Sequence, residues 1–218
     1  ELTNPGEPLT RGKIYESNSL LLQIALEQQG IQPQLITHVE DSIEATSNTL
    51  KNALNNSDVV LVSGGISVGD YDFVKVALEQ LAVETLFYKV RQRPGKPLYF
   101  GKKENSFVFA LPGNPASTLS CFYIYVVPLL IGLKGGLSEG LMRINLPLAH
   151  DFKSEEPRAL FLKALLKNRS IEILDRQHSS MIVSFAKANA LVYLPEKKAA
   201  LKKGDLVETI LLPNTVLT

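Results

Sequence analysis

Apolar residues recur along the first 133 positions at two alternating spacings, one helical and one typical of buried strands. Helical spacing covers the stretches near 18–30, 42–54, 72–81 and 114–133, which are expected as helices. Short apolar runs lie between them, at 34–39, 58–62, 84–90, 98–100 and 107–111. These runs are typical of strands, and the continuous apolar run 58–62 indicates a strand buried on both faces.

Polar and glycine residues mark the ends of these helices. Ser17 or Asn18 can cap the first helix, and Gly30 ends it. The apolar face of that helix is expected to consist of Leu20, Leu21, Ile24 and Ala25. The residues Asp41-Ser42-Ile43-Glu44 have capping-box spacing and begin the second helix. Asn114 caps the helix after 107–111, and Pro115 occupies its first position, where a missing N–H costs nothing.

The alternation of strands with helices predicts an α/β fold, a mainly parallel sheet with helices on both faces. Ligands of such sheets bind beyond the carboxyl ends of the strands. Helical spacing disappears after Lys134-Gly135-Gly136. Apolar runs separated by turns follow, at 143–148, 159–166, 171–174, 181–186, 190–193 and 206–211. We therefore expect an α/β domain at 1–137 and a small all-β domain at 138–218.

Composition narrows the possible functions. The 218 residues are 45% hydrophobic and carry a formal net charge of +1, which argues against general affinity for nucleic acids or membranes. Recognition by charge must therefore be local. Cys121 is the single cysteine; no intramolecular disulfide can form, which fits a reducing compartment, and the thiol is expected to be buried and inert. The apolar run 123–133 is too short to span a membrane, and the polar N-terminal residues do not resemble a signal peptide.

Three glycine-containing loops carry most of the polar chemistry. The first loop is Ser63-Gly64-Gly65-Ile66-Ser67-Val68-Gly69-Asp70-Tyr71-Asp72, the second is Arg93-Pro94-Gly95-Lys96-Pro97, and the third is Leu111-Pro112-Gly113-Asn114-Pro115-Ala116-Ser117. Glycine lets backbone N–H groups approach a ligand closely, and helix N-termini after the first and third loops favour anions. Together the loops predict one polyanionic ligand held from several sides. Taken alone, the first loop is equally well explained as a tight turn between a strand and a helix.

Two carboxylates in the first loop have alternative interpretations. Asp70 can simply cap the following helix, and Asp72 would then lie in the first helical turn, where it complements the helix dipole. Alternatively, a carboxylate beside a phosphate-holding loop can bind Mg²⁺, because this hard cation takes oxygen ligands that it shares with phosphate.

The second and third loops leave similar alternatives open. Arg93 and Lys96 are either solvated charges on a hairpin or an oxyanion clamp suited to phosphate or molybdate. After the third loop, free N–H groups of Ala116, Ser117 and Thr118 are expected to point out of the helix start. Ser117 would add a hydroxyl at the same place.

These segments resemble, in order and spacing, the molybdopterin molybdenumtransferases. The resemblance covers nearly the whole chain and is carried by residues 14–19, 63–75, 93–97 and 111–117, with Arg158, Gln177, Ser179 and Gly204-Asp205 in the second half. The family includes the bacterial MoeA proteins and the E domains of animal gephyrin and its plant counterpart. The resemblance implies a MogA/MoaB-like molybdopterin-binding fold. It also implies insertion of molybdenum from molybdate into adenylylated molybdopterin, with Mg²⁺ as cofactor and release of AMP.

The resemblance also implies roles for single residues. The pterin substrate would be bound by Ser63, Gly64, Gly65, Ser67, Gly69, Asp70, Pro112, Gly113 and Asn114. Molybdate would be bound by Arg93, Lys96, Ser117, Arg158 and Ser179, although Ser180 could take the role of Ser179. Asp72 and Lys96 would be catalytic, and Asp72 would also lie near the metal. The family more often has lysine at the position of Arg93, which keeps the charge.

One departure concerns the start of the chain. In the family, Glu1-Leu2 would follow a strand and two further domains, so we expect a C-terminal fragment that lacks the first strand of its α/β domain. The resemblance implies a cytoplasmic homodimer for the full-length protein and an upstream adenylyltransferase as a partner. Two other functions stay open: a pterin-binding domain of such an adenylyltransferase, which shares the α/β fold but lacks the all-β domain, and a non-catalytic scaffold of the gephyrin type.

Overall fold

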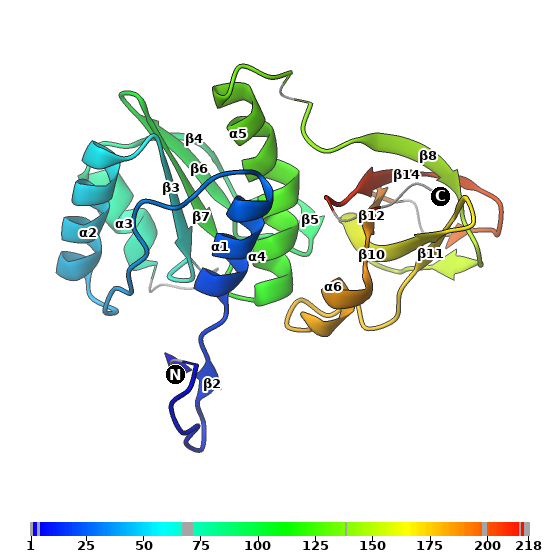
Figure 1. Ribbon diagram of the computed structural model, residues 1–218, viewed down its shortest axis with the longest axis horizontal. Coiled ribbons are helices and arrows are strands. Elements are labelled where there is room, and N and C mark those ends of the chain that lie inside the picture. The colour runs from blue at the N-terminus through cyan, green and yellow to red at the C-terminus, as the bar shows by residue number, and fades with distance from the viewer. Residues whose placement is uncertain are drawn as a thin grey trace.

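The chain folds into an α/β part, residues 18–133, and a β part, residues 143–212, which lie side by side (Figure 1). The computed structural model describes residues 2–3, 5–66, 72–137, 139–197, 200–213 and 215. Its helices are α1 (Asn18–Gln28), α2 (Ile43–Asn56), α3 (Phe73–Gln80), α4 (Pro115–Cys121), the π-helical turn η1 (Phe122–Val126), α5 (Val127–Leu133) and α6 (Val183–Lys187). Its strands are β1 (Leu2–Thr3), β2 (Ile14–Tyr15), β3 (Val59–Ser63), β4 (Glu84–Tyr88), β5 (Gln92–Arg93), β6 (Tyr99–Lys103), β7 (Ser106–Leu111), β8 (Arg143–Pro147), β9 (Phe152–Lys153), β10 (Ala159–Lys167), β11 (Ser170–Ile173), β12 (Ala190–Leu194), β13 (Ala200–Leu201) and β14 (Leu206–Leu211).

The sheet of the α/β part is mixed, and the expectation of a mainly parallel sheet is wrong. Its strand order is β3-β7-β6-β4. β3 is parallel to β7, whereas β6 is antiparallel to both β7 and β4. The short connections explain this, because residues 104–105 join β6 to β7 and no helix separates β4 from β6. Such short connections return a strand antiparallel, while a parallel neighbour needs a longer crossover.

The segment 34–39 is not a strand, contrary to the sequence-based expectation. The described residues 31–40 form no strand, and Leu35 and Ile36 are 58% and 48% exposed. Within the described residues, β3 lies at the edge of its sheet and pairs with β7 alone. An apolar run becomes a strand only where a neighbouring strand satisfies its backbone hydrogen bonds and a packed layer covers one of its faces. Among the described residues, 34–39 has no strand paired with it, and its apolar side chains stay exposed.

Helices cover both faces of this sheet, as expected. Successive residues of β7 point to opposite faces: Phe109 packs in a core with α1, α4, η1 and α5, and Val108 packs in a second core with α2 and α3. Figure 1 shows the two helical layers with the sheet between them. Ser42 caps α2 by accepting a hydrogen bond from the backbone N–H of Ala45 at 3.2 Å, which confirms the predicted start of that helix.

Helix α1 differs from its prediction in both its buried face and its cap. Leu22 and Ala25 are the buried residues, whereas Leu20 and Ile24 are 52% and 45% exposed. Neither Ser17 nor Asn18 caps the helix with its side chain. Instead, the carboxylate of Glu16 accepts hydrogen bonds from the backbone N–H of Ser19 at 2.9 Å and from its hydroxyl at 2.5 Å. This arrangement leaves the Asn18 amide available for other contacts.

The continuous helix formed by α4, η1 and α5 is the central apolar element of the α/β part. It spans Pro115–Leu133 and has a mean hydropathy of 1.8, so by length and composition it could cross a membrane. However, 67% of its apolar window is buried inside the protein, as expected for a core helix. Cys121 is completely buried, and burial raises the pKa of its thiol to about 12, so the thiol stays protonated.

The β part contains a mixed sheet in which β11, β10, β12, β14 and β8 are neighbours in that order. Most predicted strands are confirmed, but 181–186 is wrong, because α6 lies there instead. The burial pattern explains the difference: Ser184 and Phe185 are adjacent and both buried, while Val183 is 63% exposed. Adjacent residues can share a buried face of a helix turn but point to opposite faces of a strand.

A short strand of the α/β part joins the sheet of the β part. β5 pairs in parallel with β10, with Gln92 opposite Ala159 and Arg93 opposite Leu160. The backbone N–H of Ala159 also donates to the carbonyl of Arg91 at 3.2 Å. This pairing fixes the second loop against the start of β10 and so joins the two parts at one point.

Replacing Phe109 by alanine tests the core of the α/β part. Phe109 is 2% exposed and stacks on Phe100 with ring centroids 4.3 Å apart. We expect Phe109→Ala to lower the free energy of unfolding by about 3–5 kcal/mol, because it removes a buried ring and leaves a cavity. Urea denaturation followed by circular dichroism measures this. Leu137→Ala, at a side chain 84% exposed, is the control and should change stability by less than about 0.5 kcal/mol. Equal effects of the two variants would contradict this core assignment.

Candidate functional site

All three glycine loops line one cleft with a volume of about 1920 Å³. The first and third loops meet there because β3 and β7 are parallel and end together, with Ser63 opposite Leu111. The two loops are in close contact: the backbone N–H of Gly64 donates to the carbonyl of Leu111 at 3.2 Å, and a Cβ on Gly113 would lie 3.7 Å from the Cα of Gly64. The carboxyl ends of these strands therefore form the floor expected of a ligand site.

Asn18 connects these two loops, a role that the sequence analysis missed. Its side-chain amide donates to the hydroxyl of Ser63 at 2.8 Å and to the carbonyl of Gly113 at 2.7 Å. The side-chain oxygen Oδ1 of Asn18 is buried and has no hydrogen-bond partner among the described residues. The segment 14–19 signalled a family match, but only the fold shows that Asn18 spans two loops.

Both described glycines of the first loop adopt a backbone conformation that favours glycine, with φ +82° at Gly64 and φ +64° at Gly65. A Cβ on Gly65 would also lie 2.7 Å from the Cγ2 of Val74. The loop therefore packs directly on the first turns of α3. Ser67, Gly69 and Asp70, which the resemblance assigns to pterin binding, lie outside the described residues.

Asp72 is the N-cap of α3, whereas the sequence analysis placed it in the first turn. Its Oδ1 accepts from the backbone N–H of Lys75 at 3.0 Å, and its Oδ2 accepts from the hydroxyl of Tyr88 at 3.1 Å. Burial and the neighbouring Asp72 carboxylate raise the pKa of Tyr88 to about 12, so the phenol stays protonated and donates. Asp72 is not among the residues that line the cleft.

The described residues alone do not assemble a complete magnesium site. Both carboxylate oxygens of Asp72 already accept hydrogen bonds from within the protein. No group of three or more His, Cys, Asp or Glu side chains in the described part of the chain is arranged to hold a metal ion. No step of the reaction is therefore derived through a metal, and the role of Asp72 beside one stays a prediction.

The second loop is held rigidly from inside. Gln92 is 3% exposed, donates to the carbonyl of Pro94 at 3.0 Å, and accepts a hydrogen bond from the hydroxyl of Tyr125. Gly95 has φ +93°, and a Cβ there would lie 2.4 Å from the sulfur of Cys121. The loop therefore has little freedom, and Arg93 and Lys96 are carried on a fixed turn.

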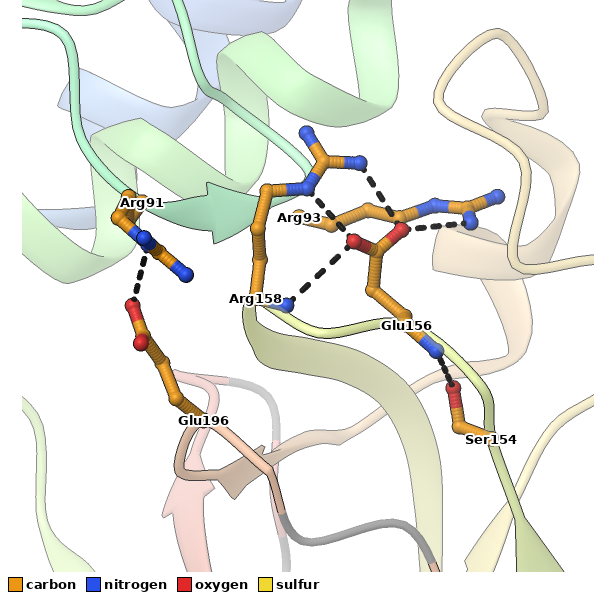
Figure 2. A network of polar contacts seen from close by, with 6 residues as sticks. All are labelled: Arg91, Arg93, Ser154, Glu156, Arg158 and Glu196. Atoms are coloured by element: carbon orange, nitrogen blue, oxygen red, sulfur yellow. Dashed lines mark hydrogen bonds and ion pairs between the residues drawn. The ribbon is translucent and has the colours of Figure 1, made fainter.

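Arg93 and Arg158 come together at this turn, although they are far apart in the sequence. Both line the cleft, Arg93 from β5 and Arg158 from the residue before β10. Figure 2 shows both side chains directed at the carboxylate of Glu156. Glu156 accepts from Arg158 Nε at 2.7 Å, from Arg158 Nη2 at 2.9 Å and from Arg93 Nη1 at 3.2 Å. The sequence analysis did not single out Glu156.

The two guanidinium groups strongly stabilise the charged form of Glu156. Hydrogen bonds from Arg158 are the largest cause, with a smaller contribution from Arg93, and they lower the pKa of the Glu156 carboxyl from 4.5 to about 2. The carboxylate is therefore ionised throughout the neutral range. Its side chain is 11% exposed, compared with 48% for Arg93 and 32% for Arg158.

Lys96 and Ser117 complete the polar lining near the arginines. Both line the cleft. The Lys96 side chain is exposed and makes no hydrogen bond or ion pair with other described residues, so its ammonium can meet a ligand. Ser117 is 3% exposed. Arg93, Lys96, Arg158 and Ser117 thus line the same cavity, and such cations with a hydroxyl are suited to a tetrahedral oxyanion.

The N–H groups at the start of α4 are not free, which corrects the sequence-based expectation. The N–H of Ala116 donates to the carbonyl of Ser179 at 3.1 Å, and those of Ser117 and Thr118 both donate to the carbonyl of Asn114 at 2.9 Å. The side chain of Asn114 does not cap the helix; it donates to the hydroxyl of Ser179 at 3.0 Å. Of the three donors that a ligand was expected to meet, the β part has thus taken one, and the carbonyl of Asn114 in the α/β part has taken the other two.

Lys163 holds the loop that carries Ser179. It is 3% exposed, and its ammonium donates to the carbonyls of Arg176, His178 and Met181 at 3.2, 3.3 and 3.2 Å. Burial lowers the pKa of this lysine. The amide of Gln177 adds hydrogen bonds to the carbonyls of Lys163 and Leu174. Ser179 therefore meets α4 as part of a fixed loop.

Family models match almost the whole chain. One, described as a probable molybdopterin binding domain, matches residues 4–132, and another, described as the MoeA C-terminal region (domain IV), matches residues 145–212. The chain belongs to the MoeA family. Its α/β part carries the molybdopterin-binding domain of that family, and its β part carries the C-terminal region.

Individual MoeA relatives agree with this assignment. A molybdopterin molybdenumtransferase from Staphylococcus epidermidis is 31% identical over 215 residues, which cover 97% of this chain and 51% of the relative. A protein with the same name from Nostoc sp. is 33% identical over 228 residues, covering 98% of this chain and 51% of the relative. The chain thus spans about half the length of these relatives.

A solved structure has the same fold. The molybdopterin biosynthesis MoeA protein from Pyrococcus horikosii superposes with a TM-score of 0.81 at 31% identity, and the match covers 97% of this MoeA-family chain and 51% of that chain. The match extends over both the α/β part and the β part.

The lowered pKa of the Glu156 carboxyl predicts how the stability of the chain depends on pH. Its folded pKa is below the ordinary value, so its contribution to stability is present above pH 4.5 and is lost as the pH falls towards about 2. Unfolding of the unaltered chain and of Glu156→Gln should be compared across this range. We expect the stability difference to be largest at neutral pH and to shrink between pH 4.5 and about 2. A difference that stays constant with pH would contradict the proposed ion pairs.

Proposed function

We propose that this chain forms the substrate cleft of a molybdopterin molybdenumtransferase, which transfers molybdenum from molybdate to adenylylated molybdopterin and releases AMP. The observation that carries the proposal is the cluster of Arg93, Lys96 and Arg158. These three cations come from both parts of the chain and line one cleft together with two glycine loops. A pterin-binding domain alone would need no cation from the β part.

Different regions of the cleft suit the two substrates. The first and third loops supply glycine backbone and the Ser63 hydroxyl, which suit a phosphorylated pterin, and Asn18 of α1 holds these two loops together. The cations at the second loop suit molybdate, a tetrahedral dianion. One continuous cleft then brings the oxyanion to the pterin, as metal insertion requires.

The protein's contribution to the chemistry is electrostatic. Cleavage of the link between AMP and the pterin phosphate develops negative charge on phosphate oxygens, and fixed cations stabilise that charge. Arg93 and Arg158 are held in place by hydrogen bonds before any substrate arrives. Their orientation therefore requires little rearrangement during the reaction.

Properties of the whole protein also belong to this proposal. Because the chain spans about half of its relatives, we propose the activity for the protein of which this cleft is a part. We further propose a cytoplasmic homodimer that uses Mg²⁺ and receives its adenylylated pterin from an upstream adenylyltransferase. The exposed apolar residues Leu20 and Ile24 on α1 are consistent with further protein contacts.

The adenylyltransferase alternative is less well supported. It explains the first and third loops but gives no function to Arg158 and Ser179 of the β part, which line the cleft. A non-catalytic scaffold would likewise leave the convergence of three cations unexplained.

Molybdate-dependent release of AMP from adenylylated molybdopterin tests the proposal. With Mg²⁺ present, we expect Lys96→Ala to lower the rate at limiting molybdate by about 10- to 100-fold, the effect of losing one charged contact. The fold should survive, because the Lys96 side chain is exposed and has no partner among the described residues.

Lys51→Ala is the matched control for this assay. Lys51 lies on α2, is exposed and does not line the cleft, so the same change of charge should leave the rate unaltered. The proposal fails if this chain, alone or within a full-length MoeA-family protein, releases no AMP in response to molybdate. It also fails if Lys96→Ala and Lys51→Ala behave alike.

A further inference from the structure

Glu156 joins the two arginines of the cleft without lining it. Its carboxylate contacts Arg93 of the α/β part and Arg158 of the β part, whereas the cleft lining includes both arginines but not Glu156. The Glu156 side chain is also the least exposed of the three, at 11%. The carboxylate therefore contacts both arginines without itself forming part of the cleft lining.

The arginines keep unused donors in this arrangement. A guanidinium group has five N–H donors. Glu156 takes Nε and Nη2 of Arg158 and a single Nη1 contact of Arg93. Further N–H groups of both side chains remain for a ligand in the cleft, so an oxyanion can bind while the carboxylate stays in place.

Glu156 is itself held in position. Its backbone N–H donates to the hydroxyl of Ser154 at 3.1 Å, and its carboxylate also accepts a long contact of 3.4 Å from the backbone N–H of Arg158. Figure 2 shows this chain of contacts from Ser154 through Glu156 to the two guanidinium groups. Without the carboxylate, two adjacent guanidinium charges would repel each other and move apart.

We propose that Glu156 is a positioning residue for oxyanion binding: it holds Arg93 and Arg158 side by side so that their free N–H groups face the cleft. This inference rests on the proposed function, because it takes the oxyanion to be molybdate. It assigns a function to an acidic residue inside a site built to bind an anion. A competing carboxylate would instead occupy the ligand position, in front of the arginines.

Equilibrium binding of molybdate tests this role. We expect Glu156→Gln and Glu156→Asp each to weaken molybdate binding by about tenfold, the usual effect of removing a residue that orients a ligand-binding side chain. Glutamine keeps the length but loses the charge, and aspartate keeps the charge but is too short to reach both arginines. If molybdate binding weakens in both variants, the effect comes from the position of the carboxylate between the arginines and not from its charge alone.

Glu196→Gln is the matched control. Glu196 pairs with Arg91 at 2.9 Å next to the same strands but outside the cleft lining, so its loss changes the net charge equally. Figure 2 shows this pair beside the Glu156 network. Glu196→Gln should leave molybdate affinity unaltered. Equal weakening in Glu196→Gln and Glu156→Gln would overturn the inference.

Binding of molybdopterin distinguishes positioning from general damage to the fold. The pterin contacts lie on the first and third loops, so both Glu156 variants should bind molybdopterin as the unaltered chain does. Parallel loss of molybdopterin and molybdate binding would overturn the inference. Tighter molybdate binding by Glu156→Gln would also overturn it, because the carboxylate would then be a competitor. If the unaltered chain binds no molybdate, both the inference and the proposed oxyanion site fail.

Discussion

The candidate site depends on one short strand pairing, in which two residues of β5 pair with two residues of β10. β5 and β10 pair in parallel over Gln92–Arg93 and Ala159–Leu160, and this short ladder attaches the second loop to the β part. The ladder places Arg93 next to Arg158. Both arginines contact Glu156, although Glu156 lies 63 positions from Arg93 in the sequence. Ser179, which accepts from the start of α4, makes a second connection. The cationic region of the cleft is therefore a product of how the two parts meet, since neither part alone contains all three cations.

Rigid supports surround this contact on both sides. On the α/β side, Gln92 and Gly95 fix the second loop against the long core helix, where Gly95 leaves no room for a Cβ beside Cys121. On the β side, the buried ammonium of Lys163 holds three carbonyls of the loop that carries Ser179. A buried charge is retained only where its donors are satisfied, and here they are used to order backbone. Both supports orient polar groups before a ligand arrives, which is how a protein binds an anion with little conformational cost.

The sequence predicted what local rules determine and missed what long-range contacts determine. The cap of α2 at Ser42 and the apolar strand β7 follow from short patterns, and the three loops could be identified from glycine beside polar residues. The prediction of a strand at 34–39 was wrong because a strand needs a paired neighbour. The prediction of free N–H groups at the start of α4 was wrong because the carbonyls of Ser179 and Asn114 accept from them. The roles of Glu156 and Asn18 could not be predicted, since each acts between segments that only the fold brings together.

We expect an oxyanion to bind where the two parts of the chain meet. Tungstate has nearly the size and charge of molybdate and scatters X-rays anomalously, so a crystal of the chain soaked in tungstate locates the site directly. A tungsten peak should lie in the cleft, within hydrogen-bond distance of Arg93, Lys96 and Arg158, with Glu156 still bound to both arginines. Tungsten found only elsewhere on the chain, or in the place of the Glu156 carboxylate, would contradict this expectation.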